Sequence, residues 1–444
     1  MKSKHPFPGP VSVSMIGELK QYVATEPFPF VVDIEASHGM YLATPDQQEI
    51  FDWAGYFGSK LLGHNHPGLY EPDYTKRLVF AANNKLANPD FLSRECLDYY
   101  RLLHSIAPAC MRNPSLEVYA INSGAEAVEN LMKYLLVLHG ERFPSTRKDA
   151  SVKRFIYFDH AFHGRTMFAL NITQPLHDPA ASSQFRNYVS ENTCIPFPSV
   201  DCSQPAGRNI TRARQSLEQT EACLKKYRGE VAGIIVEPIQ GAGGHRMAAP
   251  SFFRELSRLA HEYDTFLAFD EVQTAGGQTG TVFACDQLEL PHPPQAVAVG
   301  KKFANGAVYM LEPMRNRGVL DSTWGGSLAD MVRFGQEMKI VKRENLMAQV
   351  ASKTAVLTAG LRGLEQKYSH LLFNVRGMGL YQGFTMRSME MKARLIRRAL
   401  QDEQLLLLGG GRQSLRFRPV LDVTEADIGL MLQKLEQVLQ TLEV

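Results

Sequence analysis

The amino-acid sequence predicts an α/β protein with two parts: a large domain built on a mainly parallel, doubly wound sheet, and a smaller α/β domain. From about residue 115, short apolar runs typical of buried strands alternate with amphipathic helices, and this alternation favours a parallel sheet. After residue 326, long helical segments precede a further set of apolar runs. The length of 444 residues also exceeds what one small core requires. We expect the large domain at residues 67–325, and the small domain to combine an N-terminal segment, 1–66, with residues 326–444.

The expected elements follow in chain order. Residues 28–44 alternate in short apolar runs and predict a small antiparallel element. The strands of the large sheet are predicted at EVYAI (117–121), RFIYF (154–158), VAGIIVEP (231–238), FLAFDE (266–271) and AVAVG (296–300), with a helix over Glu126–Leu138. The second part is predicted from helices over Ala329–Val341 and Leu346–Gln366, the run LLLLGGG and a C-terminal helix. Residues 176–212, rich in Pro, Ser and Asn, are predicted to be a loose linker.

The charge balance excludes two classes of partner. With 48 basic and 46 acidic residues the formal net charge is +2, so no broad electrostatic field favours nucleic acid or an anionic membrane. The six cysteines form no C-x-x-C pair, and neither a signal peptide nor a run of about 18 apolar residues is found. We therefore expect a cytoplasmic protein whose partners are small molecules or another copy of itself.

The strongest local signals are an acid and a lysine at the ends of two predicted strands. Asp270 ends FLAFD and Lys301 follows AVAVG, so both lie at the carboxyl edge of the sheet, where open α/β sheets bind ligands. A lysine in such a place can form a Schiff base. Taken alone, Asp270 could cap the next turn, and Lys301 with Lys302 could be a solvated pair. The sequence GKKF lacks the G-x-x-x-x-G-K-[ST] pattern, which excludes a nucleotide P-loop.

Two further segments offer binding groups. NSGAEAVEN (122–130) places small residues where a strand meets a helix, and such a helix start offers N–H groups to a phosphate, although an ordinary capping turn would look the same. FDHAFHGRT supplies the aromatic face of Phe162 and the guanidinium of Arg165, which suit ring stacking and a carboxylate. His160 and His163 are three residues apart, but no Cys, Asp or Glu cluster completes a metal site, so we expect no metal.

Together and in this order, these motifs resemble those of the class III (ω-amino acid) aminotransferases of the fold type I pyridoxal-phosphate superfamily. The resemblance spans nearly the whole chain, through GMYL, LGHNHP, SGAEAVEN, FHGRT, EPIQGAGG, FDEVQT, GKK, TWGG and LRFRPVL. Within the family the chain is most similar to the lysine 6-aminotransferases, with the 4-aminobutyrate aminotransferases close behind, notably in GGGRQSLRFRPVL. The resemblance implies pyridoxal 5'-phosphate as cofactor. It also implies transfer of the terminal amino group of a lysine-like ω-amino acid to a 2-oxo acid, with 2-oxoglutarate the expected acceptor.

The resemblance assigns roles to individual residues. Lys301, rather than Lys302, would hold the cofactor as a Schiff base and then move the proton between substrate and cofactor. Asp270 would pair with the pyridine nitrogen and keep it protonated, so that the ring remains an electron sink. The other cofactor-binding residues implied are Gly124 and Ala125 for the phosphate, Phe162 for stacking, His163, Gln273 near the ring hydroxyl, and Thr323. In the family a threonine of the neighbouring subunit completes the phosphate site, so Thr323 implies a homodimer, although without the resemblance it would be a turn residue.

Two arginines are implied for the substrate carboxylates: Arg165 for the far carboxylate of the ω-amino donor, and Arg416 for the α-carboxylate of the keto acid. Arg416 could instead be a surface arginine, which is what we expect of Arg418. The chain departs from the family at Ala242, where relatives carry a Glu that pairs with the second arginine. Arg416 therefore either finds another acid or stands open. Lys60, where relatives usually have a small residue near the substrate entrance, is either solvated or biases the pocket toward acidic substrates.

Other functions share part of these features. A racemase, decarboxylase or aminomutase would use the same fold and lysine chemistry, and turnover of an amino acceptor separates them. Among aminotransferases, a 4-aminobutyrate-type or ornithine-type donor is the alternative to a lysine-like one. A cofactor-free binding or structural protein is disfavoured because Lys301, Asp270 and Phe162 are all retained.

Overall fold

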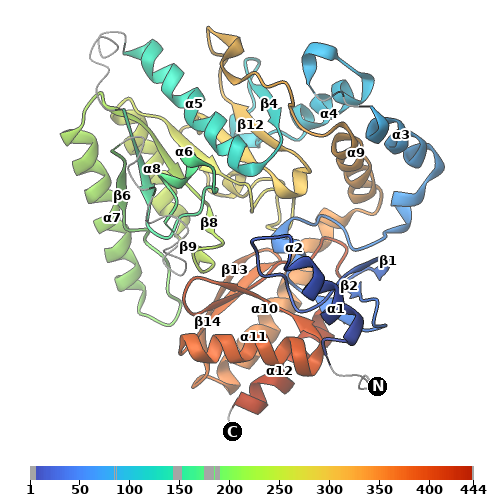
Figure 1. Cartoon of the computed structure of the whole chain (residues 1–444). Coiled ribbons are helices and arrows are strands. Elements are labelled where there is room, and N and C mark those ends of the chain that lie inside the picture. Colours follow the sequence, from blue (N-terminus) through green and yellow to red (C-terminus); the bar gives the residue numbers. More distant parts are fainter. Residues whose placement is uncertain are drawn as a thin grey trace.

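A computed structural model of the chain describes residues 7–84, 86, 88–143, 153–174, 185 and 191–442. Its centre is a seven-stranded sheet in the order β4-β12-β11-β10-β7-β5-β6 (Figure 1). The strands are β4 Glu117–Ile121, β5 Arg154–Phe158, β6 Thr193–Ile195, β7 Val231–Val236, β10 Leu267–Asp270, β11 Ala296–Val299 and β12 Gly306–Met310. Neighbouring strands from β11 to β6 are parallel, whereas β12 runs antiparallel to both β11 and β4. The predicted mainly parallel sheet is confirmed.

Helices cover both faces of this sheet, as successive side chains of β10 demonstrate. Phe269 packs with Phe253 of α8 (Pro250–Glu262), whereas Ala268 belongs to a second buried cluster with Leu131 of α5 (Gly124–Arg142). The long helix α7 (Ala206–Lys226) lies against α8, and α6 (Met167–Leu170) is a single turn beside α5. Because side chains alternate between the faces of a strand, helices on both faces make the sheet doubly wound.

The predicted linker over residues 176–212 is wrong at its C-terminal end. Strand β6 pairs with β5, and α7 begins at Ala206. The polar residues after Ala206 form the first turns of an amphipathic helix, whose buried face includes Thr220 and Leu224 further along. Their composition therefore resembled that of a loop. Residues 175–184 and 186–190 lie outside the described residues.

Two four-stranded sheets make up the second part of the molecule. In one, β1 Asp33–His38, β2 Tyr41–Ala43 and β3 Glu49–Asp52 are joined by β15 Leu405–Leu406, so segments from both ends of the chain share a sheet. The other has the antiparallel order β13 Leu372–Met378, β14 Tyr381–Met386, β17 Ser414–Phe417, β16 Leu408–Gly410. The accompanying helices are α9 Leu328–Arg343, α10 Val350–Lys367, α11 Met389–Glu403 and α12 Glu425–Leu442. The domain boundaries at residues 66 and 325 stay predictions.

Shorter elements connect these layers. The remaining helices and strands are α1 Pro10–Leu19, α2 Gly55–Gly58, α3 Pro72–Asn83, α4 Arg94–Ser105, β8 Ile239–Gln240 and β9 Arg246–Met247. The single 3₁₀ turns are η1 Pro67–Tyr70, η2 Pro89–Phe91, η3 Ala109–Met111, η6 Ala284–Gln287, η7 Lys301–Phe303, η8 Arg317–Leu320 and η9 Leu346–Gln349. Across the described part of the chain, no helix combines the length and apolar character needed to cross a membrane.

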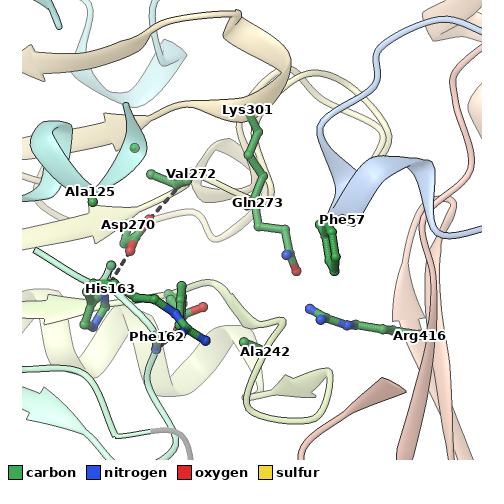
Figure 2. Close-up of a pocket in the computed structure, with 14 residues that line it drawn as sticks. Phe57, Ala125, Phe162, His163, Ala242, Asp270, Val272, Gln273, Lys301 and Arg416 are labelled. Atoms are coloured by element: carbon green, nitrogen blue, oxygen red, sulfur yellow. Dashed lines mark hydrogen bonds and ion pairs between the residues drawn. The ribbon is translucent and has the colours of Figure 1, made fainter. Parts of the chain in front are cut away.

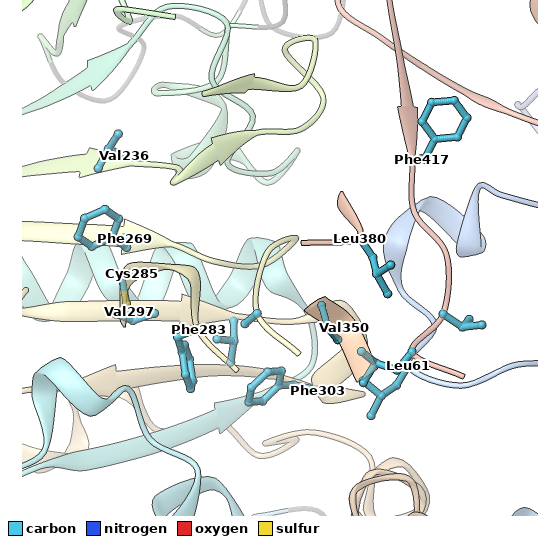
Figure 3. Close-up of a cluster of buried hydrophobic side chains, with 14 of the residues drawn as sticks. Leu61, Val236, Phe269, Phe283, Cys285, Val297, Phe303, Val350, Leu380 and Phe417 are labelled. Atoms are coloured by element: carbon cyan, nitrogen blue, oxygen red, sulfur yellow. The ribbon is translucent and has the colours of Figure 1, made fainter. Parts of the chain in front are cut away.

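One hydrophobic core connects the large sheet to the second part (Figure 3). Phe269 and Val297 of the large sheet belong to the same buried cluster as Leu61, Leu380 and Phe417. All five side chains are at most 1% exposed. Because a close-packed core fixes the elements that share it, the carboxyl edge of the large sheet and strand β17 are held on either side of a defined space.

Candidate active site

A cavity of about 460 Å³ lies between the carboxyl edge of the large sheet and strand β17 (Figure 2). Nine predicted site residues line it: Gly124, Ala125, Phe162, His163, Arg165, Asp270, Gln273, Lys301 and Arg416. Phe57, Gly164, Glu237, Ala242 and Val272 complete the lining. Segments that are far apart in the sequence therefore converge on one space, as the carboxyl-edge argument predicts.

Asp270 ends β10, and both of its carboxylate oxygens are held. Oδ2 lies 2.7 Å from Nδ1 of His163, and Oδ1 accepts the backbone N–H of Val272 at 2.9 Å. The His163 and Asp270 side chains are 0% and 4% exposed. Asp270 thus caps the following turn and also presents a buried carboxylate at the cavity. A carboxylate fixed in this way is suited to hold a cationic ring nitrogen.

Lys301 follows β11 and projects into the cavity from a left-handed backbone conformation, with φ 51°. Non-glycine residues adopt this conformation at a cost, and such strain concentrates at functional sites. Burial lowers the pKa of the Lys301 ammonium, the charge of Arg416 lowers it further, and Asp270 partly opposes the change. A larger fraction of the amine is therefore neutral and nucleophilic.

Lys302, the neighbouring lysine, is buried on the other side of the turn. Its Nζ donates to the main-chain oxygens of Gln273 at 2.6 Å and Gly58 at 3.2 Å, and to the hydroxyl of Tyr381 at 2.7 Å. An ammonium has three hydrogens, so all of them are used. The geometry agrees with the choice of Lys301 over Lys302.

The start of α5 is capped by Ser123 and lies at the cavity. The hydroxyl of Ser123 accepts the backbone N–H of Glu126 at 3.3 Å, and Gly124 and Ala125 then line the cavity. The N–H groups of a helix's first turn have no partner within the helix and attract anions. A Cβ on Gly124 would lie 2.5 Å from Cγ1 of Val272, so only glycine fits there. The capping interpretation of NSGAEAVEN is therefore confirmed, and phosphate binding at the same turn stays a prediction.

Phe162 and Arg165 reach the cavity from the loop after β5. The backbone N–H of Phe162 donates to Oε1 of Glu237 at 2.9 Å, which fixes the loop beneath the aromatic ring. The guanidinium of Arg165 lies 5.9 Å from the centre of the Phe162 ring. Arg165 is exposed while it lines the cavity, so it lies at the opening.

Glu237 is a candidate residue that the sequence analysis missed. It follows β7 as Asp270 ends β10, so the rule about carboxyl edges could have found it. Burial and the charge of Asp270 raise the pKa of its carboxyl well above the usual value, while Arg416 lowers it. Phe57 also lines the cavity, and no sequence pattern indicated it.

Arg416 lies on β17 and directs its guanidinium into the cavity (Figure 2). Its Nε donates to the carbonyl of Gly409 at 2.9 Å, whereas Nη1 is buried without a hydrogen-bond partner. Burial lowers the pKa of Arg416 to about 10, and Glu237 opposes the change. Ala242 lines the same cavity without a charge. Among the described residues Arg416 forms no ion pair, so it stands open, and Glu237 is an acid that acts on it electrostatically.

The prediction of a surface position for Arg418 is wrong, because this residue is 1% exposed. Its Nη2 lies 3.0 Å from Nδ1 of His245 and donates to Oε1 of Gln273 at 3.2 Å. The guanidinium also lies 4.2 Å from the centre of the Tyr381 ring. The spacing of two residues along an extended chain places Arg416 and Arg418 on one side. That side faces the large sheet instead of solvent.

Two further predicted residues lie away from the cavity. Thr323 is exposed, and its carbonyl accepts Nδ2 of Asn88 at 3.1 Å. Lys60 is half-buried, its Nζ lies 3.2 Å from Nδ1 of His64, and burial lowers its pKa. Lys60 is therefore not a fully solvated lysine, and it does not line the cavity.

Comparisons of sequence and structure agree on one family. The family model described as aminotransferase class-III matches residues 22–439. The L-lysine-epsilon aminotransferase of Streptomyces clavuligerus is 30% identical over 428 residues, which cover 94% of this chain and 92% of that protein. The mitochondrial 4-aminobutyrate aminotransferase of Rattus norvegicus is 29% identical over 446 residues, covering 94% and 86%. The solved structure of the lysine aminotransferase from M. tuberculosis in the internal aldimine form matches with a TM-score of 0.90 at 27% identity, over 97% of this chain and 99% of that one.

Proposed function

Since the chain belongs to the class III aminotransferases, we propose that it moves the terminal amino group of a lysine-like ω-amino acid to a 2-oxo acid, with 2-oxoglutarate as acceptor. The reaction class and the pyridoxal-phosphate cofactor follow from the family, whereas the lysine-like donor and the acceptor are the proposal. The observation that carries it is a single cavity in which Lys301 and Asp270 meet Arg416. One substrate can therefore reach a Schiff-base lysine and a carboxylate binder at the same time.

The residues that line the cavity fit this cofactor in their chemistry. The residues that would hold it are Lys301 at the aldehyde, Asp270 at the pyridine nitrogen, Phe162 at the ring face, and Gly124 with Ala125 at the phosphate. Gly124 and Ala125 line the cavity at the first turn of α5, so an anionic group in the cavity could approach the N–H groups of that turn. When bound, pyridoxal phosphate supplies an aldehyde that condenses with amines and a conjugated ring that takes up electrons.

Lys301 performs the acid–base work in this proposal. Burial keeps its pKa low, so Nζ is available as a neutral amine that attacks an aldehyde carbon. Once a substrate amine had displaced it, Nζ would be a base within the cavity that could take a proton from the substrate carbon and deliver it to the cofactor carbon. Asp270 remains in a fixed orientation throughout because His163 and the turn at Val272 hold its two oxygens.

The two arginines orient the substrates. A donor whose terminal amine reaches Lys301 would place its distant carboxylate at Arg165, near the opening. A 2-oxo acid carries its carboxylate next to the reacting carbon, and this carboxylate would bind Arg416 deeper in the cavity. With Ala242 beside it and Nη1 open, Arg416 can bind a carboxylate without first breaking an ion pair.

The test is a panel of lysine, ornithine, 4-aminobutyrate and β-alanine, each with 2-oxoglutarate or pyruvate. We expect lysine with 2-oxoglutarate to give the highest kcat/KM, with the terminal aldehyde of lysine and glutamate as products. Lys301→Ala protein in the same assay is the control. Release of CO₂, or racemisation of the donor without an aminated acceptor, would assign a different pyridoxal-phosphate reaction.

We also propose a homodimer. Consecutive parts of the chain, the end of α3 and the segment after it, expose the large apolar side chains Val79, Phe80, Leu86, Phe91 and Leu92. An apolar surface of this kind typically marks a protein interface. Asn88 of the same segment binds the carbonyl of Thr323, so Thr323 lies beside that surface. Light scattering should give twice the chain mass, and Phe80→Glu should reduce it to a monomer with weaker cofactor binding.

We further propose that the protein acts in the cytoplasm. None of the six cysteines, all of which lie among the described residues, forms a disulfide, and Cys202 is exposed at the surface. Exposed free thiols are typical of reducing compartments. Cell fractionation with an antibody against the chain tests this location.

A further inference from the structure

Two cationic side chains, those of Lys302 and Arg418, donate hydrogen bonds to Gln273, and both also contact Tyr381. Lys302 donates from Nζ to the main-chain oxygen of Gln273 at 2.6 Å, and Arg418 donates from Nη2 to its Oε1 at 3.2 Å. Tyr381 connects the two cations, because its hydroxyl accepts from Lys302 at 2.7 Å and its ring lies 4.2 Å from the Arg418 guanidinium. We refer to Lys302, Tyr381 and Arg418 as the Gln273 clamp.

The Gln273 clamp is buried at an electrostatic cost. Each of its three side chains is 1% exposed, and neither cation forms an ion pair with a carboxylate among the described residues. Burial lowers the pKa of Arg418 to about 9 and that of Lys302 well below its usual value. Unpaired buried cations destabilise a folded protein, so they are expected where they serve a site.

Two glycines make room for this arrangement. A Cβ on Gly241 would lie 1.6 Å from Oε1 of Gln273, and a Cβ on Gly276 would lie 2.5 Å from Cε of Lys302. Any larger residue at Gly241 would displace the Gln273 amide from Arg418. The glycine-rich segment EPIQGAGG therefore shapes the space in which the Gln273 side chain lies.

We propose that Lys302, Tyr381 and Arg418 are positioning residues that hold Gln273 as a hydrogen-bond donor toward the ring oxygen of the bound cofactor. Arg418 occupies the amide oxygen, so the amide nitrogen is the end left to donate into the cavity that Gln273 lines. With the cofactor bound, a fixed N–H of Gln273 would stabilise negative charge on the ring oxygen and would thereby lower the affinity of the Schiff base for its proton.

The clamp also links the two parts of the molecule. Gln273 and Lys302 follow strands of the large sheet, whereas Tyr381 begins β14 and Arg418 follows β17. The strand that presents Arg416 to a substrate therefore also orients Gln273. This inference rests on the proposed function, because it requires the cofactor ring in the cavity.

The test follows the absorbance of cofactor-loaded protein as a function of pH. In Arg418→Met, the midpoint at which the visible band changes should rise by about one pH unit, because the competing donor is lost. Gln273→Leu should give the same shift, and the double variant no more than either single change. Titration of the apoprotein should show the cofactor dissociation constant raised about tenfold in all three proteins.

Arg376→Met is the matched control. Arg376 is also buried and donates to the main-chain oxygens of Gly244 and His245, but not to Gln273. Its loss should lower the melting temperature without moving the midpoint. If the midpoint shifted equally in Arg376→Met, the Gln273 clamp would have only a structural role, and the proposal would be wrong.

An unchanged midpoint in Arg418→Met, with a shifted one in Gln273→Leu, would overturn the proposal. If Arg418→Met does not fold, Tyr381→Phe removes only one acceptor of Lys302, and it should move the midpoint in the same direction by a smaller amount. No shift in that folded variant would equally refute the clamp. A wild-type chain that gives no visible band with the cofactor at any pH would instead contradict the proposed function.

Discussion

The carboxyl edge of the large sheet and strand β17 meet at the cavity, and each carries two cationic residues. In each pair the two residues have different surroundings. On the large sheet, Lys301 faces the cavity, while Lys302 donates to three protein groups. On β17 and the residue after it, Arg416 donates to one carbonyl and keeps Nη1 open, while Arg418 contacts Phe417, His245 and Gln273. In both pairs the residue with few protein partners is the one that lines the cavity. We infer that the number of hydrogen bonds a cation makes within the protein decides its role. A cation with few such bonds is available to bind a ligand, whereas one with several holds other protein groups in position.

The largest effect on turnover should distinguish Lys301 from Lys302. Lys301→Ala removes the Schiff-base amine and the proton carrier, so kcat should fall by about 10⁴-fold or more in a folded protein. Lys302→Ala should keep the covalent attachment and lower the free energy of unfolding by about 3 kcal/mol, because three acceptors lose their donor. Turnover, denaturant unfolding, and borohydride reduction with peptide mapping measure these outcomes. Attachment lost in the Lys302 variant would place the catalytic lysine one residue later.

The next largest effect is expected at Asp270, the other side chain at the carboxyl edge of the large sheet to which we assign a catalytic role. Asp270→Asn should bind the cofactor but lose about 100-fold or more in kcat, since a neutral amide cannot keep a ring nitrogen protonated. The amide oxygen can still accept the N–H of Val272, so the turn stays capped. The loss should therefore appear in proton transfer, measured in single turnovers, and the melting temperature should change little. Near-normal rates would make Asp270 a structural residue.

The sequence predicted local features of this arrangement more completely than tertiary ones. Strands β4 and β5 match EVYAI and RFIYF residue for residue, because short β-branched and aromatic runs between turns are local signals. Strand β12, GAVYM, was not predicted. It starts with glycine directly after the Lys301 turn, and its place is set by pairing with β11 and β4, which are distant in the chain or reversed in direction.

The site shows the same division. Asp270 and Lys301 follow from a general rule about strand ends, and the rule extends to Glu237. The burial of Arg418 could not be predicted, because arginines two apart in a strand usually mark its solvent face. Which face of a strand meets another sheet is decided by packing between segments far apart in the sequence.

A smaller effect is expected when Arg416, of the second pair, is given a carboxylate partner. Ala242→Glu should form a charge-assisted pair with Arg416, so donors that need this arginine lose affinity. The kcat/KM ratio of lysine or 4-aminobutyrate to glutamate should then rise by about tenfold. Ala242→Gln, which adds similar bulk without charge, is the control. A uniform loss of rate with an unchanged ratio would mean that the charge of Arg416 is already neutralised, with Glu237 of the same cavity as the candidate acid.

The smallest effect concerns the influence of the Arg416 charge, on β17, on the pKa of Lys301 at the edge of the large sheet. Arg416 is the second cause, after burial, of the low pKa of Lys301. Removing this positive charge in Arg416→Met should raise the pKa of the Lys301 ammonium, because a protonated amine is then repelled less. Burial, the larger cause, is retained, so the pKa should rise but remain below that of a free lysine.

The measurement is the rate at which apoprotein captures pyridoxal as a function of pH. At any pH below the pKa, a higher pKa leaves less neutral amine, so capture by Arg416→Met should be slower and its profile should move to higher pH. Arg165→Met is the control, since an exposed guanidinium is screened by solvent and salt and should leave the profile in place. A profile that moves downward, or equally in both variants, would show that the two edges do not act on each other through charge. If only the Arg416→Met profile moves upward, Arg416 on β17 increases the fraction of Lys301 that is a neutral, reactive amine.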